Sequence, residues 1–482
     1  MSKGIFTGGD WQAAGGDVFE STNPADGTPL WQGQAASAQD VDAAYRAARA
    51  AFTDWSETPF EARKELVLRF RDIALAKKDA LAGLIARETG KVLWDASGEA
   101  GAIGPKVDIS LKAYEDRTGT SSTPTAFGRA DLQHRPHGVM AVLGPYNFPA
   151  HLPNGQIIPA LIAGNTIVYK PSEQCPAVGE FMMGLYAEAG FPPGVLNMVQ
   201  GARETGAAVL DHEALDGVLF TGAASTGAFI HKKFGGRPDI ILALEMGGNN
   251  PLLVWEAADA KAVASILVQS SFITTGQRCT CARRILLPKG AQGDAILDAV
   301  LELVDSMKIG PWDADEAFMG PLISAPIADH VVERFDALSG QVIRAAKILP
   351  KGAAFVSPGV IDVTDEDNPD EEIFGPVMQI HRVGSFEEGI REANNTRFGL
   401  SAGLVSDNVA LWEVFRRKIR AGVVNFNRPT TGAAGFLPFG GPGLSGNHNP
   451  GAYYAADFCA WPMASQIAET VETLPAKGLS TC

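Results

Sequence analysis

Between residues 138 and 248, short apolar segments alternate with segments compatible with amphipathic helices, and this alternation restricts the possible folds more than any other feature. A strand followed by a helix, repeated about every 20–25 residues, is typical of a parallel sheet covered on both faces. Such sheets bind nucleotides beyond the carboxyl ends of their strands. We therefore expect the functional residues in the loops that follow the strands. The strand-like segments are GVMAVLG (138–144), NTIVYKP (165–171), GVLNMVQ (194–200), DGVLFTG (216–222) and IILALEMGG (240–248).

A second α/β block is predicted after the first. It opens with the strand-like segment PLLVW (251–255) and continues with a helix-compatible run from Ala258 into Ser271. The apolar segment ARRILLP (282–288) then predicts a strand, and a further helix is expected from about Gln292. Two linked α/β blocks fit a chain of 482 residues, which is long enough for two or three domains.

The two ends of the chain carry other signals. Ser37 and Asp40 form a capping-box pattern in front of apolar residues at helical spacing, and Gly90 is placed to end a third helix. Near the C-terminus, FCAWPMASQIAE (458–469) predicts a strand that pairs with a neighbour in the chain or with another subunit.

The composition excludes several classes of function. The formal net charge of −15 argues against a nucleic-acid partner, because nucleic-acid-binding proteins usually carry a basic surface. No segment resembles a signal peptide or approaches the ~18 apolar residues of a membrane span. The five cysteines are not spaced as a disulfide framework, which indicates a cytoplasmic protein. No cysteine or histidine spacing indicates a metal site.

Two cysteines one residue apart, Cys279 and Cys281, stand in the stretch TGQRCTCARR. Cys279 follows a polar loop at the end of a predicted long helix, which is a suitable place for a reactive thiolate with donors nearby. Most isolated cysteines are instead small buried side chains, and this alternative stays open from the residues alone. Arg278 is adjacent in sequence and either lowers the pKa of the Cys279 thiol or points into a domain interface.

Seven stretches, taken together and in order from about residue 20 to 470, resemble the NAD(P)-dependent aldehyde dehydrogenase superfamily. Each stretch alone would be a weak signal, and their combination makes the resemblance specific. The stretches are GPYNFP (144–149), YKPSE (169–173), LFTGAASTG (219–227), LEMGGNNP (244–251), TGQRCTCARR (275–284), EEIFGPV (371–377) and FLPFGG (436–441).

The resemblance implies a catalytic role for three residues. Cys279 matches the nucleophile that attacks the aldehyde carbonyl, and Asn147 matches the amide donor that holds the developing oxyanion together with the backbone N–H of Cys279. Glu245 matches the general base that activates water to hydrolyse the resulting thioester. A carboxyl group at the end of an apolar strand is expected to have a raised pKa. Since coenzyme A-acylating members of the superfamily typically lack this glutamate, we expect a free carboxylate as the product.

The resemblance also implies the cofactor-binding residues. Lys170 and Glu173 match the pair that holds the adenosine ribose, and a carboxylate at Glu173 would repel a 2′-phosphate, so NAD is expected rather than NADP. Glu372 and Phe374 match the residues that hold the nicotinamide ribose and orient the ring. The family often has serine where this chain has Ala223. The pyrophosphate is expected at the turn formed by Gly222, Ala223, Ala224, Ser225, Thr226 and Gly227.

The implied architecture is an α/β fold with a Rossmann-like NAD-binding domain, an α/β catalytic domain and a small β oligomerisation element. We expect the NAD-binding domain at 1–246, with part of the oligomerisation element near 118–137. The catalytic domain is expected at 247–425, and residues 426–482 are expected to return to the NAD-binding domain and to form the oligomerisation tail. The resemblance further implies a homodimer or a dimer of dimers.

Within the superfamily, KVDIS (106–110), AYEDRTG (113–119) and GNHNPGAYYAADFCAWPMAS (446–465) are most similar to members that oxidise N-succinyl-L-glutamate 5-semialdehyde in arginine catabolism. The carboxylates of that substrate need cations or rigid donors as partners, and Arg117, Arg283 and Arg428 are the candidates. For each of these arginines, a surface ion pair is the alternative.

Other functions stay open at this stage. Succinate semialdehyde and glutamate semialdehyde are alternative substrates. A non-catalytic binding or structural protein on the same fold and a thiol hydrolase are alternatives of other classes. Cys281 is interpreted as secondary to Cys279, with a reversible disulfide between the two cysteines as a further hypothesis.

Overall fold

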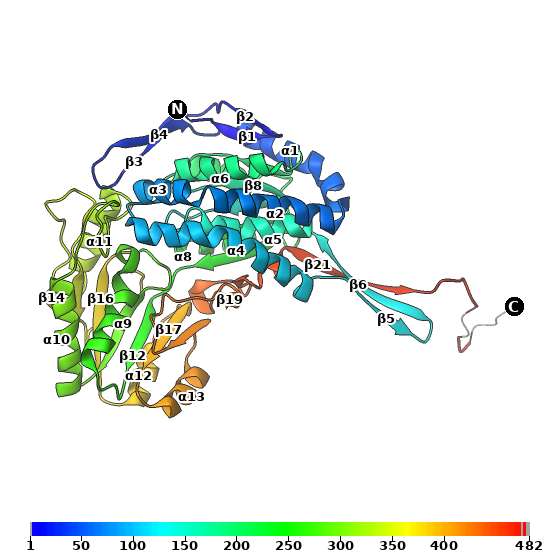
Figure 1. Cartoon of the computed structure of the whole chain (residues 1–482). Coiled ribbons are helices and arrows are strands. Elements are labelled where there is room, and N and C mark those ends of the chain that lie inside the picture. Colours follow the sequence, from blue (N-terminus) through cyan, green and yellow to red (C-terminus); the bar gives the residue numbers. More distant parts are fainter. Residues whose placement is uncertain (1, 474–475, 479–482) are drawn as a thin grey trace.

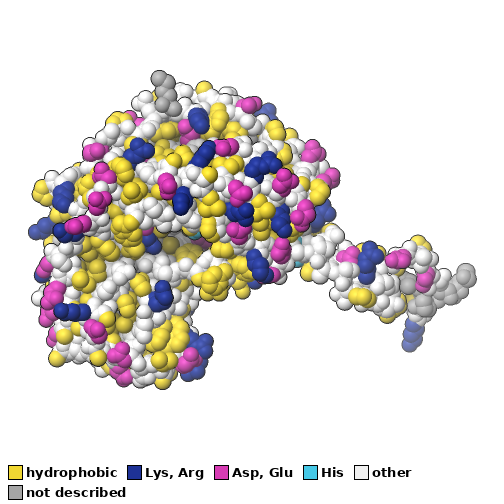
Figure 2. Space-filling view, viewed as in Figure 1, with side chains coloured by type: hydrophobic (Ala, Val, Ile, Leu, Met, Phe, Trp, Pro, Cys, Tyr) yellow, Lys and Arg dark blue, Asp and Glu magenta, His cyan; other side chains and the backbone are white. Residues whose placement is uncertain are grey.

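The computed structural model describes residues 2–473 and 476–478, and Cys482 lies outside these residues. Figure 1 shows two large α/β parts and a narrow arm of strands that projects from one of them. The space-filling view shows that the surface is indented between the two large parts, and that acidic and basic side chains are intermingled on this face (Figure 2). In the described part of the chain, no helix is long and apolar enough to cross a bilayer.

The first sheet contains all five strands that the sequence predicts between residues 138 and 248, and these strands are parallel. The α/β prediction is therefore confirmed for this block. In spatial order the sheet consists of β11 (Ile241–Met246), β10 (Gly217–Gly222), β7 (Val139–Leu143), β8 (Thr166–Lys170), β9 (Leu196–Met198), β1 (Ile5–Thr7) and β2 (Asp10–Gln12).

Helices cover both faces of this sheet because the side chains of each strand alternate between two apolar cores. Met140 and Val142 of β7 pack into one core, and Val139 and Ala141 pack into the other. The first core is covered by α2 (Phe60–Ala76), α3 (Lys78–Thr89), α4 (Leu93–Arg117), α5 (His151–Ala163) and α6 (Pro176–Ala189), and the second by α1 (Ala38–Glu57), α7 (Arg203–Asp211) and α8 (Ala224–Lys233).

Two predicted helix ends are confirmed. Ser37 and Asp40 form both hydrogen bonds of a capping box at the start of α1. Gly90 ends α3 with a φ of 78°, the left-handed conformation in which glycine has no steric penalty. These local signals fix where the covering helices begin and end.

The strand order places a topological switch point between β7 and β10. From β7 the chain adds β8 and β9 on one side, and it then returns to place β10 on the other side. The connections that follow β7 and β10 therefore lead to opposite sides of the sheet, and a crevice forms between the carboxyl ends of these two strands. Asn147 follows β7, and the turn at 222–227 follows β10.

A second sheet of seven strands forms the other large part, and its order is β14-β15-β16-β13-β12-β17-β18. All of its neighbouring strands are parallel except β14 and β15. Its strands are β12 (Asn250–Val254), β13 (Ala282–Pro288), β14 (Gln341–Arg344), β15 (Gly359–Asp362), β16 (Val377–Val383), β17 (Ser401–Val405) and β18 (Val423–Phe426). Its helices are α9 (Ala260–Phe272), α10 (Ala291–Asp305), α11 (Ala325–Asp336), α12 (Phe386–Ala393) and α13 (Val409–Lys418).

The projecting arm is a three-stranded antiparallel sheet of β5 (Ser121–Thr125), β6 (Gly128–Pro136) and β21 (Ala460–Ile467) (Figure 1). The strand predicted near the C-terminus is thus present, and its partner is β6 of the same chain. The remaining elements are the hairpin of β3 (Val18–Thr22) and β4 (Pro29–Gln34), the pair β19 (Pro438–Phe439) and β20 (Gly451–Ala452), and the short helix α14 (Ala455–Phe458).

Candidate active site

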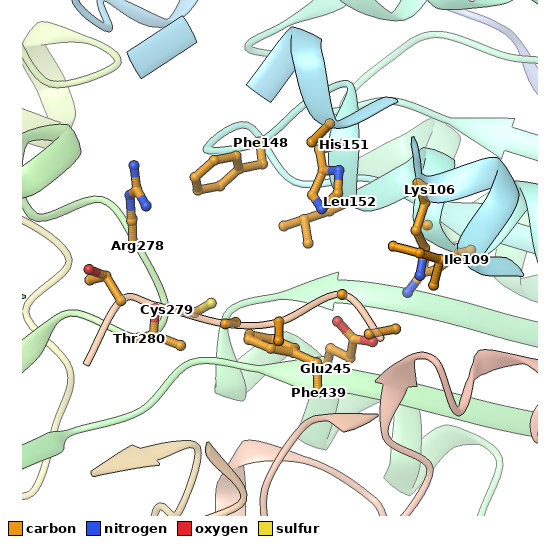
Figure 3. Close-up of a pocket in the computed structure, with 18 of the residues that line it drawn as sticks. Lys106, Ile109, Phe148, His151, Leu152, Glu245, Arg278, Cys279, Thr280 and Phe439 are labelled. Atoms are coloured by element: carbon orange, nitrogen blue, oxygen red, sulfur yellow. The ribbon is translucent and has the colours of Figure 1, made fainter. Parts of the chain in front are cut away.

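Two cavities meet at Cys279 and Glu245, and these two residues line both of them. The larger cavity, of about 890 Å³, lies at the switch point and contains the turn after β10. The smaller cavity, of about 340 Å³, extends away from it between α4, α5 and the segment that leads to β20. Figure 3 shows the smaller cavity, with Cys279 and Arg278 on one side of the view and Lys106 and Ile109 on the other.

The loop that carries Cys279 begins with a strained backbone. The chain leaves α9 through a short 3-10 turn, Ile273–Gly276, in which Thr274 and Thr275 have φ values of 57° and 56°. A positive φ is unfavourable for a β-branched residue, so surrounding contacts must maintain it. One such contact is the hydroxyl of Thr274, which donates to the buried carboxylate of Asp95. Strain of this kind is often concentrated at functional sites.

Asn250, the first residue of β12, holds the same loop from the side of the second sheet. Its Nδ2 donates to the carbonyl oxygens of Cys279, at 2.7 Å, and of Cys281, at 2.9 Å. Its Oδ1 accepts from the backbone N–H of Ser401 at 2.9 Å. A single buried amide therefore ties three separate segments together, which fixes the position of the Cys279 backbone.

Asn147 reaches this loop from the first sheet. Its Nδ2 donates to the carbonyl oxygen of Gln277 at 3.0 Å. The start of α5 just beyond it is anchored by Glu99, which accepts from the backbone N–H groups of Ala150 and His151. The structure therefore places the amide of Asn147 beside the loop that carries Cys279, an arrangement compatible with an oxyanion site.

Glu245 stands near the carboxyl end of β11, with its carboxyl group in the wall of both cavities. Burial raises the pKa of this carboxyl to about 7, and the charge of Lys106 partly offsets that rise. The direction agrees with the raised pKa expected from the sequence. A carboxyl with this pKa is divided between its acid and base forms at neutral pH, which suits a general base.

Gly451 in β20 has no side chain, and the Glu245 carboxyl occupies the space where a Cβ would lie. A Cβ at position 451 would lie 1.7 Å from Oε1 of Glu245. We expect Gly451→Ala to displace this carboxyl and to lower the hydrolytic rate by about 10–100-fold, because small misplacements of catalytic groups have large effects. Steady-state NADH formation and single-turnover NADH formation are the measurements.

Gly236→Ala is the matched control for this variant, since a Cβ at position 236 meets no atom within 4 Å. Both variants should retain the circular dichroism spectrum of the wild type. Equal activity of Gly451→Ala and Gly236→Ala would contradict the role assigned to Gly451.

The Cys279 thiol is partly exposed, whereas Cys281 is buried and its thiol donates to the carbonyl of Ile273. Burial raises the pKa of Cys279, the carboxyls of Glu372 and Glu245 raise it further, and the charge of Arg283 lowers it. Burial also raises the pKa of Cys281, and the charges of Arg283 and Arg278 partly offset that rise. Among the charges that act on Cys279, Arg283 and not Arg278 lowers the pKa.

The larger cavity has the features of a dinucleotide site. Its volume is within the range of ligand pockets, and Gly222 to Thr226 of the predicted turn line it. α8 begins at this turn without a side-chain cap, so its first backbone N–H groups are available to an anion. Gly227 does not line the cavity, and a Cβ there would lie 2.1 Å from Sδ of Met246. Its role is the close packing of α8 on the sheet.

The other predicted cofactor residues lie at or near the same cavity. Glu372 and Phe374 line it, and a Cβ at Gly247 would lie 1.8 Å from the Glu372 carboxyl, so a glycine is needed there. Lys170 and Glu173 form an ion pair of 3.5 Å at the end of β8, and the serine between them lines the cavity. The residues present therefore fit a bound dinucleotide.

The three arginines predicted for the substrate carboxylates do not line the smaller cavity. Arg117 is paired with the carboxylate of Asp457, and Arg428 is exposed in the loop after β18. Arg283 is fully buried on the cofactor side, where it lies 3.3 Å from Glu372. Arg117 and Arg283 are thus committed to carboxylates of the chain, and none of the three arginines lines the smaller cavity.

Sequence reasoning missed two residues that the structure brings to the site. Asn250 stands in the stretch LEMGGNNP and Lys106 in KVDIS, but no local pattern marks either as functional. Asn250 makes hydrogen bonds to distant segments, and Lys106 reaches the cavity because α4 packs against α5. Among the described residues, no group of three or more His, Cys, Asp or Glu residues is arranged to hold a metal ion.

The sequence matches the aldehyde dehydrogenase family over residues 11–461. This chain belongs to the aldehyde dehydrogenase family. It is 54% identical over 473 residues to an N-succinylglutamate 5-semialdehyde dehydrogenase from Caulobacter sp. (strain K31), with 98% of both chains covered. It is 52% identical over 466 residues to the protein of the same name from Paraburkholderia xenovorans (strain LB400), with 96% of both covered.

Solved structures agree with this membership. A 1-pyrroline-5-carboxylate dehydrogenase from Thermus with bound NAD is similar with a TM-score of 0.90 and 29% sequence identity, over 96% of this chain and 92% of that chain. The α/β aldehyde dehydrogenase fold expected from the sequence is thus confirmed.

Proposed function

We propose that this aldehyde dehydrogenase uses NAD to oxidise N-succinyl-L-glutamate 5-semialdehyde to N-succinyl-L-glutamate, as part of arginine catabolism. The observation that carries the chemistry is that Cys279 and Glu245 line both cavities, so that one cavity can hold a cofactor and the other an aldehyde. The substrate is supported by the names of relatives that are 54% and 52% identical over almost the whole chain.

The first step forms a bond between Sγ of Cys279 and the aldehyde carbon. The thiol proton passes to a water molecule, and the carbonyl π bond opens so that its oxygen becomes an oxyanion. The amide of Asn147 and the backbone N–H of Cys279 would donate to this oxygen. Because Asn250 and Asn147 already hold the loop, the donors need little rearrangement as charge develops.

NAD, when bound, supplies the acceptor for the hydride of the aldehyde carbon. Residues 222–226, Lys170, Glu173, Glu372 and Phe374 would hold it. We propose a preference for NAD over NADP, because the carboxylate of Glu173 would repel a 2′-phosphate.

The second half of the reaction is the hydrolysis of the thioester on Cys279. Glu245 removes a proton from water, the water oxygen adds to the thioester carbon, and the C–S bond breaks. The products are the carboxylic acid and the thiolate of Cys279. Glu245 is suited to this step because its pKa of about 7 keeps an appreciable fraction ionised at neutral pH.

A panel of aldehydes tests the proposed substrate. NADH formation is measured with N-succinylglutamate semialdehyde, glutamate semialdehyde, succinate semialdehyde and pentanal, each also with NADP. We expect kcat/KM for the succinylated compound to exceed the others by about 100-fold or more, since sites built for polar groups reject substrates that lack them. Equal or better use of another aldehyde would contradict the substrate and leave the reaction type intact.

The resemblance to aldehyde dehydrogenases also supports a proposed division into domains. Residues 1–246 form the NAD-binding domain, with part of the oligomerisation element near 118–137. Residues 247–425 form the catalytic domain, and residues 426–482 return to the NAD-binding domain and form the oligomerisation tail. The projecting arm carries exposed apolar side chains at Phe127 and Trp461, which supports assembly as a homodimer or a dimer of dimers. A cytoplasmic location is proposed because the four described cysteines are free thiols.

A further inference from the structure

Lys106 is a buried cation in the wall of the smaller cavity. It lies in α4 and is only 4% exposed, and its stem crosses to α5, where a Cβ at Gly155 would lie 3.4 Å from Cε. In Figure 3, Lys106 stands beside Ile109 on the side of the cavity opposite Cys279 and Arg278. An extended aldehyde that reacts at Cys279 can therefore reach toward Lys106 with its other end.

The ammonium group of Lys106 has no carboxylate within 4.0 Å among the described residues. Burial lowers the pKa of Lys106 to about 8, and the nearby Glu245 and Cys459 partly offset this fall, so the lysine stays protonated at neutral pH. Arg278, the other cation in the wall, is already paired with Asp95 at 2.7 Å. A buried charge without a direct partner is unfavourable, and an anion in the cavity would compensate it.

Two polar atoms near Lys106 are also without a partner. Nδ1 of His151 and Oε1 of Gln156 are buried and make no hydrogen bond within the described residues, and both side chains line the cavity. Nε2 of Gln156 is held by the hydroxyl of Thr221 at 3.1 Å, which leaves Oε1 as an acceptor. Burial, together with the charges of Lys106 and Lys91, lowers the pKa of His151 to about 4, so this ring is neutral.

These groups match the chemistry of an N-acylated amino acid. An ammonium group and a neutral imidazole suit a carboxylate, and a free amide oxygen suits an N–H donor. The rest of the wall is largely apolar, with side chains such as Ile109, Leu152 and Phe439, which strengthens any charge pair formed inside.

We propose that Lys106 binds a carboxylate of the aldehyde substrate and thereby gives the enzyme its preference for acidic over neutral aldehydes. This inference rests on the proposed function, since N-succinyl-L-glutamate 5-semialdehyde carries the carboxylates in question. Lys106 replaces the three arginines as the cationic partner of the substrate. It is a specificity residue, because the bond-making steps take place at Cys279 and Glu245.

Lys106→Met tests this role, because methionine has a similar length and no charge. We measure kcat and KM with N-succinylglutamate semialdehyde and with pentanal at neutral pH, where Lys106 is protonated and any change in the pKa of Glu245 affects both aldehydes alike. For the acidic aldehyde we expect kcat/KM to fall about 10–100-fold, mostly through KM, as for loss of a charged hydrogen bond. For pentanal we expect a fall of at most about threefold.

Lys106→Arg should recover part of the affinity for the acidic aldehyde. Lys112→Met is the matched control, since Lys112 lies in the same helix but is exposed and paired with Asp116. Thermal unfolding and circular dichroism check that the variants fold.

The outcomes separate the two proposals. If the wild type does not prefer the succinylated aldehyde, the proposed substrate fails, and the role of Lys106 falls with it. If the wild type prefers it but Lys106→Met lowers kcat/KM for both aldehydes by the same factor, or for neither, only the role of Lys106 is overturned. An equal fall would indicate that Lys106 acts through Glu245 instead.

Discussion

Replacing Cys279 with alanine should abolish NADH formation with every aldehyde in the panel. We expect kcat to fall by about four to six orders of magnitude, because removal of a covalent nucleophile leaves only the contribution of binding and orientation. No other described cysteine can substitute for it, since Cys175, Cys281 and Cys459 are fully buried. The measurement is the initial rate of NADH absorbance under saturating NAD.

The matched control for this prediction is Cys281→Ala. Cys281 lies two residues away, and its thiol faces the carbonyl of Ile273 rather than either cavity. We expect this variant to keep its activity within about threefold of the wild type, as for a conservative change outside the reacting groups. Binding of NAD to Cys279→Ala, followed by protein fluorescence, should be retained. More than about 1% residual activity in Cys279→Ala would exclude Cys279 as the essential nucleophile.

Glu245→Gln should block the second half of the reaction more than the first. Glutamine keeps the shape of the side chain but cannot accept a proton from water, so the steady-state rate should fall about 10²–10⁴-fold. Formation of NADH in a single turnover should fall much less, because this phase precedes the proton transfer from the hydrolytic water. The acyl-enzyme should then accumulate and be visible as a mass increase of the intact protein.

The pH dependence follows from the same residue. Because burial raises the pKa of Glu245 to about 7, the carboxyl is protonated and inactive as a base below this pH. The steady-state rate of the wild type should therefore rise with pH through about 7, and Glu245→Gln should lack this rise. Asp239→Asn, at an exposed position paired with Arg237, is the control and should keep the wild-type profile.

A comparison of the single-turnover rate with the steady-state rate can contradict the assignment of Glu245 to thioester hydrolysis. If Glu245→Gln slows the single turnover and the steady state by the same factor, Glu245 must also take the proton of Cys279. The structure makes this a meaningful test, because burial and two neighbouring carboxyls raise the pKa of the Cys279 thiol.

The sequence predicted a large part of the fold. The five apolar segments between 138 and 248 became the parallel strands β7 to β11, because a strand buried on both faces must be apolar along its length. The capping box at Ser37 and the glycine at position 90 also formed as predicted, since helix ends depend on neighbouring residues. Linked motifs pointed to Cys279, Glu245 and Asn147, and the structure brings all three to one place.

The substrate side of the site was not predictable in the same way. Three arginines were expected to meet the substrate carboxylates, but Arg117 and Arg283 are neutralised by Asp457 and Glu372, which lie 340 and 89 residues away in the chain. Charge alone does not indicate which cations are already paired, because the partners come from distant segments.

The sequence by itself determined the strands, the helix ends and the type of reaction, because these depend on local patterns and on motifs of a few residues. Only the tertiary structure decided that β10 lies beside β7, and that Asn250 and Asn147 hold the Cys279 loop from the two sheets. It also decided that Lys106 faces the smaller cavity without a direct counterion. The physical reason is that the burial and pairing of a charge depend on which distant segments pack around it.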